Sequence, residues 1–220
     1  MAITKEATIT SKKILVLGAT GGTGRHVVSQ ALAKGHDVTV LVRDPNRLTT
    51  VSERLRVLTG SVPDNSGALA AATIGQDVVI STLGVGNSLK SSGLITRSTP
   101  AIVQAMQASG VRRVIFTSAY GVGATLSDVP LLPRMLMRLL FGDLYSDKAA
   151  GEDVLRRSGL DWTLVYPVTL TNGPRLGRYR VGERLALRGF PRMSRADVAE
   201  FLLEQAEDNT YLRKGVLISS

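Results

Sequence analysis

The 220-residue chain has no cysteine and only two histidines. The absence of cysteine excludes disulfides, a thiol nucleophile and thiolate metal ligands. Because His26 and His36 lie within and just after the first predicted helix, far from any cluster of carboxylates, we also expect no metal site. Long apolar runs are missing and residues 1–12 are polar, so the sequence predicts neither a membrane span nor a signal peptide. These absences are typical of a cytoplasmic protein, which is the location we expect.

Aromatic residues are also scarce, at 5%, whereas 27 basic residues face 18 acidic ones, a net charge of +9. A basic chain can bind nucleic acid, an acidic membrane or an anionic small molecule. The arginines are scattered, and no dense basic run is interleaved with aromatics. We therefore expect an anionic cofactor and a small-molecule substrate, and neither nucleic acid nor a membrane as a partner.

Glycine is abundant by contrast, and three glycines with the spacing G-x-x-G-x-x-G follow the strand-like segment 13–17, which is aliphatic after Lys13. This pattern is typical of a buried parallel strand that turns tightly into a helix whose N-terminus binds a phosphate. Gly18 lets the backbone turn off the strand, Gly21 lets the main chain approach a pyrophosphate, and Gly24 lets the helix pack closely. The motif therefore predicts a dinucleotide site at this loop.

Strand-like and helix-like segments alternate along the rest of the chain, which argues for a parallel sheet with helices on both faces. We expect a single-domain α/β fold of the doubly wound Rossmann type over residues 13–220, after a polar extension at 1–12. Ligands in such sheets bind outside the carboxyl ends of the strands. The predicted strands are 13–17, 37–42, 55–59, 77–82, 113–118, 162–166 and 216–218, and the predicted helices are 22–34, 68–73, 100–108, 144–157 and 194–207.

The end of the second predicted strand distinguishes the two nicotinamide dinucleotides. A carboxylate there binds the ribose 2′-hydroxyl of NAD, whereas arginine accommodates the 2′-phosphate of NADP. Arg43 follows the strand directly, and Arg47 comes four residues later, where a turn can bring it to the same phosphate. Asp44, between them, is expected to pair with an arginine or to cap the next turn. We therefore favour NADP(H) over NAD(H).

Seven segments, in this order along the chain, carry a family resemblance. They are GATGGTG (18–24), VTVLVRDPNRL (38–48), GQDVVISTLG (75–84), GVRRVIFTSAYG (110–121), VLRRSGLDWTLVYP (154–167), GRYRV (177–181) and SRADVAEFLL (194–203). Together they resemble an atypical short-chain dehydrogenase/reductase, of the branch that holds biliverdin reductase B (flavin reductase) and the NmrA-like NAD(P)-binding proteins. The resemblance covers nearly the whole chain and implies a Rossmann fold with a dinucleotide cofactor.

The resemblance also implies which residues contact the cofactor. At the glycine loop these are Gly18, Thr20, Gly21, Gly22, Thr23 and Gly24, with Arg43 and Arg47 at the 2′-phosphate. Further along they are Ser61 and Val62 at the adenine, Leu83 and Gly84 at the ribose, and Thr117, Ser118, Lys148, Pro167 and Thr169 near the nicotinamide. Ser61 departs from the family, in which an aspartate is usual.

Better-known members of this family use a serine, a tyrosine and a lysine four residues after the tyrosine. The tyrosine donates a proton to a carbonyl oxygen, and the lysine lowers the pKa of the tyrosine and binds the nicotinamide ribose. Ser118 and Lys148 match the serine and the lysine, but position 144 is leucine. Tyr145, three residues before Lys148, and Tyr120, just past Ser118, remain as candidate catalytic residues beside Ser118 and Lys148.

The missing Tyr-x-x-x-Lys pair favours a reaction that needs mainly hydride delivery, with a proton available from solvent. The leading hypothesis is an NADPH-dependent oxidoreductase acting on a conjugated acceptor such as a flavin, a quinone or a tetrapyrrole, with Ser118 orienting nicotinamide and substrate. One alternative is an NmrA-like protein that senses NADP(H) without catalysis. Another is a carbonyl reductase or dehydrogenase that uses Tyr145 or Tyr120.

Residues 130–141 are apolar nearly all round, with Arg134 and Arg138 one turn apart. Methionines within the segment can adapt to irregular ligands. The segment is therefore a lid over an apolar, anionic substrate, a helix packed in the core, or an interface between two copies of the chain. The sequence leaves these three readings open, and with them the choice between a monomer and a homodimer.

Overall fold

The computed structural model describes residues 11–220 except Asn87, Leu89, Pro130 and Arg188, with the backbone alone at 131–133 and 136–138. Apart from Ser11 and Lys12, the predicted polar extension lies outside the described residues. No helix in the described part of the chain is long and apolar enough to cross a membrane.

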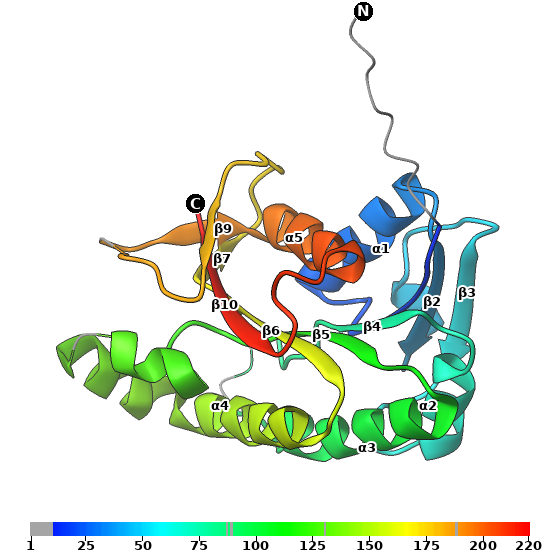
Figure 1. Ribbon diagram of the computed structural model, residues 1–220, viewed down its shortest axis with the longest axis horizontal. Helices are drawn as coiled ribbons and strands as arrows, with labels where there is room; N and C mark the ends of the chain where they lie inside the picture. The colour runs from blue at the N-terminus through cyan, green and yellow to red at the C-terminus, as the bar shows by residue number, and fades with distance from the viewer. Residues whose placement is uncertain (1–10, 87, 89, 130, 188) are drawn as a thin grey trace, which may run out of the picture.

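An eight-stranded sheet forms the centre of the molecule, in the order β3-β2-β1-β4-β5-β6-β10-β8 (Figure 1). Its neighbours pair in parallel except β8, which is antiparallel to β10. The order reverses between β1 and β4, the switch point at which doubly wound sheets bind ligands. Its strands are β1 (Lys13–Leu17), β2 (Asp37–Val42), β3 (Leu55–Thr59), β4 (Val78–Ser81), β5 (Arg113–Thr117), β6 (Asp161–Pro167), β8 (Arg180–Gly182) and β10 (Lys214–Ser219).

Helices cover both faces of this sheet, which confirms the predicted Rossmann-type α/β fold (Figure 1). One layer contains α1 (Gly22–Ala33) packed against α5 (Arg195–Glu207). The other contains α2 (Ser66–Thr73), α3 (Leu94–Ser109) and α4 (Leu131–Arg157), each packed against the next. Short 3-10 helices, η1 (Pro45–Arg47) and η2 (Gly123–Asp128), follow β2 and β5.

The core follows the hydrophobic pattern of the central strands. In β1, Ile14, Leu15, Val16 and Leu17 are all fully buried, because helices cover both sides of the strand. Each such side chain stabilises the fold by about 2 kcal/mol relative to an exposed one. The edge strand β3 has no buried residue, as expected where one side of the sheet ends.

Helix α3 begins at Leu94, six residues before the predicted start. The Asp147 carboxylate accepts hydrogen bonds from the Ile95 N–H (3.0 Å), the Thr96 N–H (2.8 Å) and the Thr96 hydroxyl (2.7 Å). A residue of α4 thus supplies the cap that the sequence around Leu94 lacks, and Pro100, expected to start the helix, lies inside it.

Helix α4 also begins earlier than predicted, so residues 131–141 continue directly into the expected helix 144–157. Its first turns extend away from α3 at the left of Figure 1. Met135, Leu139 and Leu140 there are 62%, 82% and 51% exposed. The core-helix reading of the segment 130–141 is therefore wrong for these side chains, while the lid and the interface readings stay predictions; Pro130 lies outside the described residues.

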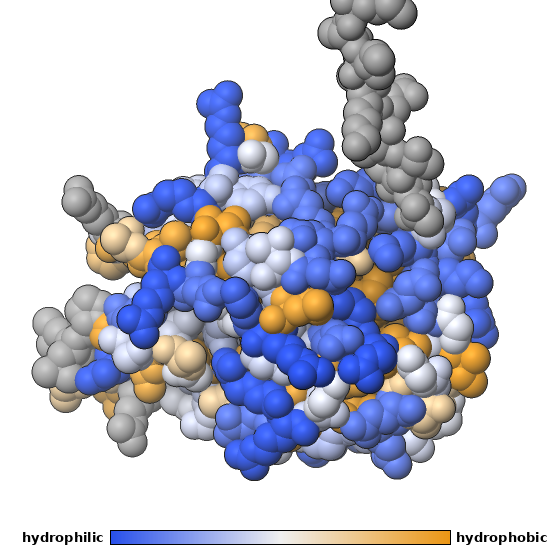
Figure 2. Space-filling view, in the orientation of Figure 1, coloured by the Kyte–Doolittle hydropathy of each residue, from blue (hydrophilic) through white to orange (hydrophobic). Residues whose placement is uncertain are grey.

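Most of the face in Figure 2 is hydrophilic, with hydrophobic residues confined to small patches.

Three short strands between residues 169 and 194 were not predicted from the sequence. Besides β8, they are β7 (Thr169–Thr171) and β9 (Arg192–Ser194), which pair in parallel as a separate sheet. This small sheet leads directly into α5.

Candidate functional site

The glycine loop joins the carboxyl end of β1 to α1. Gly18 has a φ of +83°, and a side chain there would meet the Thr82 carbonyl at 2.8 Å. At Gly24 a side chain would collide with the Gly18 carbonyl oxygen. Helix α1 can therefore begin this close to β1 only because residue 24 has no side chain. The Gly21 N–H donates to the same oxygen at 2.9 Å. Both predicted roles, the turn at Gly18 and the close packing at Gly24, are confirmed.

The start of α1 has the properties of an anion site. Gly21 and Gly22 are exposed, Gly21 supplies no side-chain cap, and the first turn carries no acidic residue. The first N–H groups of a helix have no partner within it and carry partial positive charge. Thr20 is half-buried and Thr23 buried in the same loop. These residues therefore fit a pyrophosphate.

Arginines gather beside this loop at the end of β2. Arg43 and Arg47 are both exposed, and the Asp44 carboxylate accepts a hydrogen bond from the Asn46 N–H at 3.0 Å. Asp44 thus caps η1, one of its two expected roles. Arg25 of α1 reaches the same turn, since its Nη2 donates to the Arg47 carbonyl at 3.4 Å. Within the described residues none of these guanidiniums pairs with a carboxylate, so all three charges remain available to a phosphate.

The predicted adenine and ribose contacts follow β3 and β4, at the same edge of the sheet. Val62 is buried and Ser61 half-buried, with the Ser61 hydroxyl donating to Asp64 at 3.0 Å. A carboxylate therefore lies beside this position although the residue itself is serine. Leu83 is half-buried and Gly84 exposed.

Ser118 belongs to a buried hydrogen-bond network next to the end of β5. Its hydroxyl donates to Glu152 Oε1 at 2.5 Å, and the Tyr166 hydroxyl donates to Glu152 Oε2 at 2.7 Å. Arg156 donates to the Tyr166 oxygen at 3.0 Å. Burial raises the pKa of the Glu152 carboxyl, against the lowering effect of its hydrogen bonds to Ser118 and Tyr166. The network holds Ser118 in one orientation.

Lys148 lies one turn before Glu152 on α4, and its Nζ donates to the Thr117 carbonyl at 3.4 Å. Burial lowers the pKa of its ammonium group, and the Glu152 and Asp147 carboxylates oppose this effect. Among the described residues, the buried Thr117 hydroxyl has no hydrogen-bond partner. Pro167 ends β6 and Thr169 begins β7 at the same end of the sheet.

The two candidate tyrosines differ in their surroundings. The Tyr120 hydroxyl donates to the Asp128 carbonyl at 3.0 Å, so its proton is already engaged. Tyr145 stacks on Phe141 with ring centroids 6.2 Å apart. Burial raises the pKa of both phenols. Among the described residues, neither hydroxyl is hydrogen-bonded to Ser118 or Lys148.

A cavity of about 610 Å³ lies between η2 and the first half of α4. Gly123 in its wall has a φ of +53°, and a side chain there would collide with Glu152 Oε2. The cavity is therefore adjacent to the Ser118–Glu152 pair. Arg134 is the basic residue among the described residues that line it, which are Gly121, Val122, Gly123, Leu126, Arg134, Met135, Gly142, Tyr145, Ser146 and Ala149.

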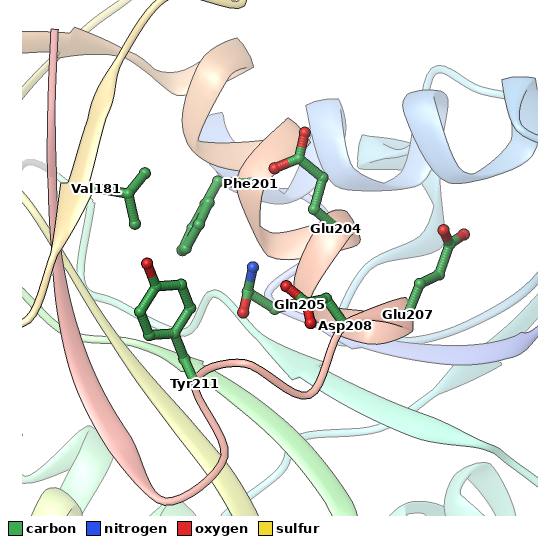
Figure 3. Close-up of a pocket in the computed structure, with 7 residues that line it drawn as sticks. All are labelled: Val181, Phe201, Glu204, Gln205, Glu207, Asp208 and Tyr211. Carbon is green, nitrogen blue, oxygen red and sulfur yellow. The ribbon is translucent and has the colours of Figure 1, made fainter.

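A second hollow, of about 570 Å³, is lined by the last turns of α5 together with Val181 and Tyr211 (Figure 3). Its carboxylates, Glu204, Glu207 and Asp208, would repel phosphates. The opposite end of α5 starts beside the glycine loop, at Arg195. This acidic hollow therefore does not belong to the dinucleotide site.

Comparison with known proteins supports the same assignment. A family model described as NAD(P)H-binding matches residues 18–209. The chain belongs to this NAD(P)H-binding family. It is thus an atypical short-chain dehydrogenase/reductase, as the motifs predicted.

Two proteins are similar to this chain in sequence. An uncharacterised chloroplastic protein of Arabidopsis thaliana is 30% identical over 180 residues, 78% of this chain and 64% of its own length. An isoflavone reductase homologue of maize is 30% identical over 148 residues, 63% of this chain and 45% of its own length. The chain thus spans less than two thirds of either relative.

A solved structure with a similar fold is that of ChuY, an anaerobillin reductase of Escherichia coli O157:H7, with a TM-score of 0.79. The two chains are 23% identical, and the match covers 94% of this chain and 96% of ChuY. At this identity the likeness shows the shared Rossmann fold.

Two basic residues beside the glycine loop, Arg25 and Arg195, were not predicted as site residues. Arg25 carries a signal that could have been used, since it is one turn into the helix after the glycine loop. Arg195 carries none, because it reaches the loop only through the packing of α5 on α1.

Proposed function

We propose that this protein is an NADPH-dependent reductase that transfers hydride to a conjugated acceptor such as a flavin, a quinone or a tetrapyrrole. Binding of NAD(P)H is a property of its family. One relative above is named as an isoflavone reductase homologue, and ChuY, which shares the fold, is named as an anaerobillin reductase.

The observation that carries this proposal is the bonding of Ser118. Its hydroxyl donates to the buried Glu152, not to a tyrosine, and no tyrosine in the described residues is poised between Ser118 and Lys148. Carbonyl reduction commonly relies on such a proton donor. A conjugated acceptor needs chiefly hydride, which the nicotinamide supplies when bound, and it can take its proton from water.

The chain's own residues then have separate tasks. Ser118, held by Glu152, orients the nicotinamide and the acceptor, and Lys148 places a positive charge beside them. The cavity between η2 and α4 has apolar residues such as Met135 in its wall, together with the basic Arg134. This combination suits a planar acceptor that carries an anionic group. Arg25, Arg43 and Arg47 favour NADPH over NADH, because three guanidiniums that pair with no carboxylate in the described residues suit a dianionic 2′-phosphate.

The test follows the absorbance of NADPH in the presence of FMN, a quinone or biliverdin, with NADH in parallel. We expect oxidation of NADPH with at least one acceptor and slower oxidation of NADH. Tight binding of both NADP⁺ and NADPH without turnover of any acceptor would contradict the proposal and favour a sensor of the redox state. Turnover of ketones that a Tyr145→Phe change abolishes would instead favour a carbonyl reductase.

A further inference from the structure

The side chain of Arg195 lies across the start of α1. A methyl group at Gly22 would be 2.7 Å from Arg195 Cδ and 2.8 Å from its Nε. The arginine therefore occupies the space that any other residue at position 22 would need. Its guanidinium carbon lies 3.7 Å from the same point, so the charged end is also close to the first residue of α1.

Two neighbouring strand ends hold Arg195 in this place. Strands β7 and β9 pair in register up to Thr171 and Ser194, and the next residues are Asn172 and Arg195. Asn172 Oδ1 accepts a hydrogen bond from Arg195 Nη1 at 2.7 Å. The amide is neutral, and no carboxylate in the described residues pairs with Arg195. The guanidinium thus keeps its full charge and most of its donors.

The backbone on both sides of Arg195 is anchored by the buried carboxylate of Asp197. Its Oδ1 accepts from the N–H groups of Leu176 (2.7 Å) and Gly177 (2.9 Å), and its Oδ2 accepts from the Ser194 hydroxyl at 2.7 Å. In addition, Gln30 of α1 donates to the Ala196 carbonyl at 2.9 Å. The first turn of α5 is therefore tied to the loop after β7 and to α1, which positions the arginine before any ligand binds.

We propose that Arg195 is a phosphate-binding residue of the dinucleotide site, set over the glycine loop by Asn172 and admitted there because residue 22 is glycine. A pyrophosphate at the start of α1 carries two negative charges, and the backbone N–H groups offer only partial positive charge. An arginine beside them adds a full charge and paired donors. This role is distinct from that of Arg43 and Arg47, which lie at the end of β2. The inference rests on the proposed NADPH site.

The experiment measures dissociation constants by isothermal titration calorimetry, with NADPH and with 2′-AMP, which carries the 2′-phosphate without the pyrophosphate. We expect Arg195→Ala to weaken NADPH binding about tenfold, and Arg195→Lys and Asn172→Ala to weaken it about threefold. Gly22→Ala should also weaken NADPH binding, because the new methyl group displaces the arginine. The affinity for 2′-AMP should be unchanged in all four variants.

Arg178→Ala is the matched control, since Arg178 is exposed on the loop that follows Asn172. It should bind NADPH like the unaltered protein. Thermal unfolding of each variant verifies that it is folded. Binding of NADPH by Arg195→Ala at the original affinity, or an equal loss of affinity for 2′-AMP, would overturn this inference and leave the proposed function intact. Failure of the unaltered protein to bind NADPH would remove the proposed function itself.

Discussion

At the scale of single residues, the arginines after β2 should decide which dinucleotide binds. Arg43 and Arg47 are exposed and face no carboxylate in the described part of the chain, so a 2′-phosphate is the group that would use their charge. Arg43→Ala and Arg47→Ala should each weaken NADPH binding about tenfold and change NADH binding less than about twofold. Fluorescence titration with each dinucleotide measures both values. Arg157→Ala, at the exposed end of α4, is the control and should bind both dinucleotides like the unaltered protein. An equal loss of affinity for NADPH and NADH in Arg43→Ala or Arg47→Ala would contradict the assignment.

Ser118 should affect the rate of reaction more than the binding of the cofactor. Its hydroxyl is buried and hydrogen-bonded to Glu152. In the proposed function, removing this hydroxyl loosens the orientation of the nicotinamide and the acceptor but takes no charge away from the phosphate sites. Ser118→Ala should lower kcat about tenfold with the best acceptor, while the dissociation constant for NADPH changes less than about twofold. Steady-state kinetics and titration separate the two effects. Ser29→Ala, on the exposed side of α1, should change neither, and an unaltered kcat in Ser118→Ala would exclude the orienting role.

At the scale of secondary structure, the start of α3 depends on one side chain of α4. Asp147 is buried and accepts three hydrogen bonds from Ile95 and Thr96. Asp147→Ala leaves the two N–H groups without their partner, and we expect a loss of about 2 kcal/mol in the free energy of unfolding. Urea unfolding measures this loss. Asp153→Ala, which alters an exposed residue of α4, is the control, and its free energy of unfolding should lie within about 0.5 kcal/mol of that of the unaltered protein. An equally small change in Asp147→Ala would show that α3 does not need this cap.

The strands and the start of α3 show which parts of the fold the sequence could predict and which it could not. The seven parallel strands of the main sheet, β1 to β6 and β10, were predicted to within two residues, because an aliphatic run between turns is a local signal. The start of α3 was not, because its cap comes from Asp147, far away in the sequence. The glycine loop, Ser118 and Lys148 are recognisable from local motifs. The placement of Arg195 depends on the pairing of two three-residue strands, β7 and β9, for which the sequence has no periodic pattern.

At the scale of the whole molecule, His36 joins three parts of the chain on one side of the sheet. Its side chain is fully buried, its Nδ1 accepts from the Lys12 N–H at 3.2 Å, and its Nε2 lies 3.3 Å from Glu207 at the end of α5. Burial lowers the pKa of the imidazole, and nearby Glu207 only partly opposes this. Protonation would also break the bond from Lys12, since Nδ1 could no longer accept.

Acid should therefore weaken the fold through this residue. A base whose pKa is lower in the folded state binds fewer protons there than in the unfolded state, so its contribution to stability is complete above the unfolded pKa and is lost as pH falls through the folded one. Urea unfolding between pH 7.5 and about 5 should show the loss begin near 6.5, the ordinary pKa of histidine. His36→Gln should lower stability at neutral pH by about 1 kcal/mol and also reduce the dependence on pH. His26→Gln, which alters the other histidine, is the control, and its free energy of unfolding should depend on pH as in the unaltered protein. If the free energy of unfolding of His36→Gln falls with pH as steeply as that of the unaltered protein, carboxylates and not His36 cause the loss.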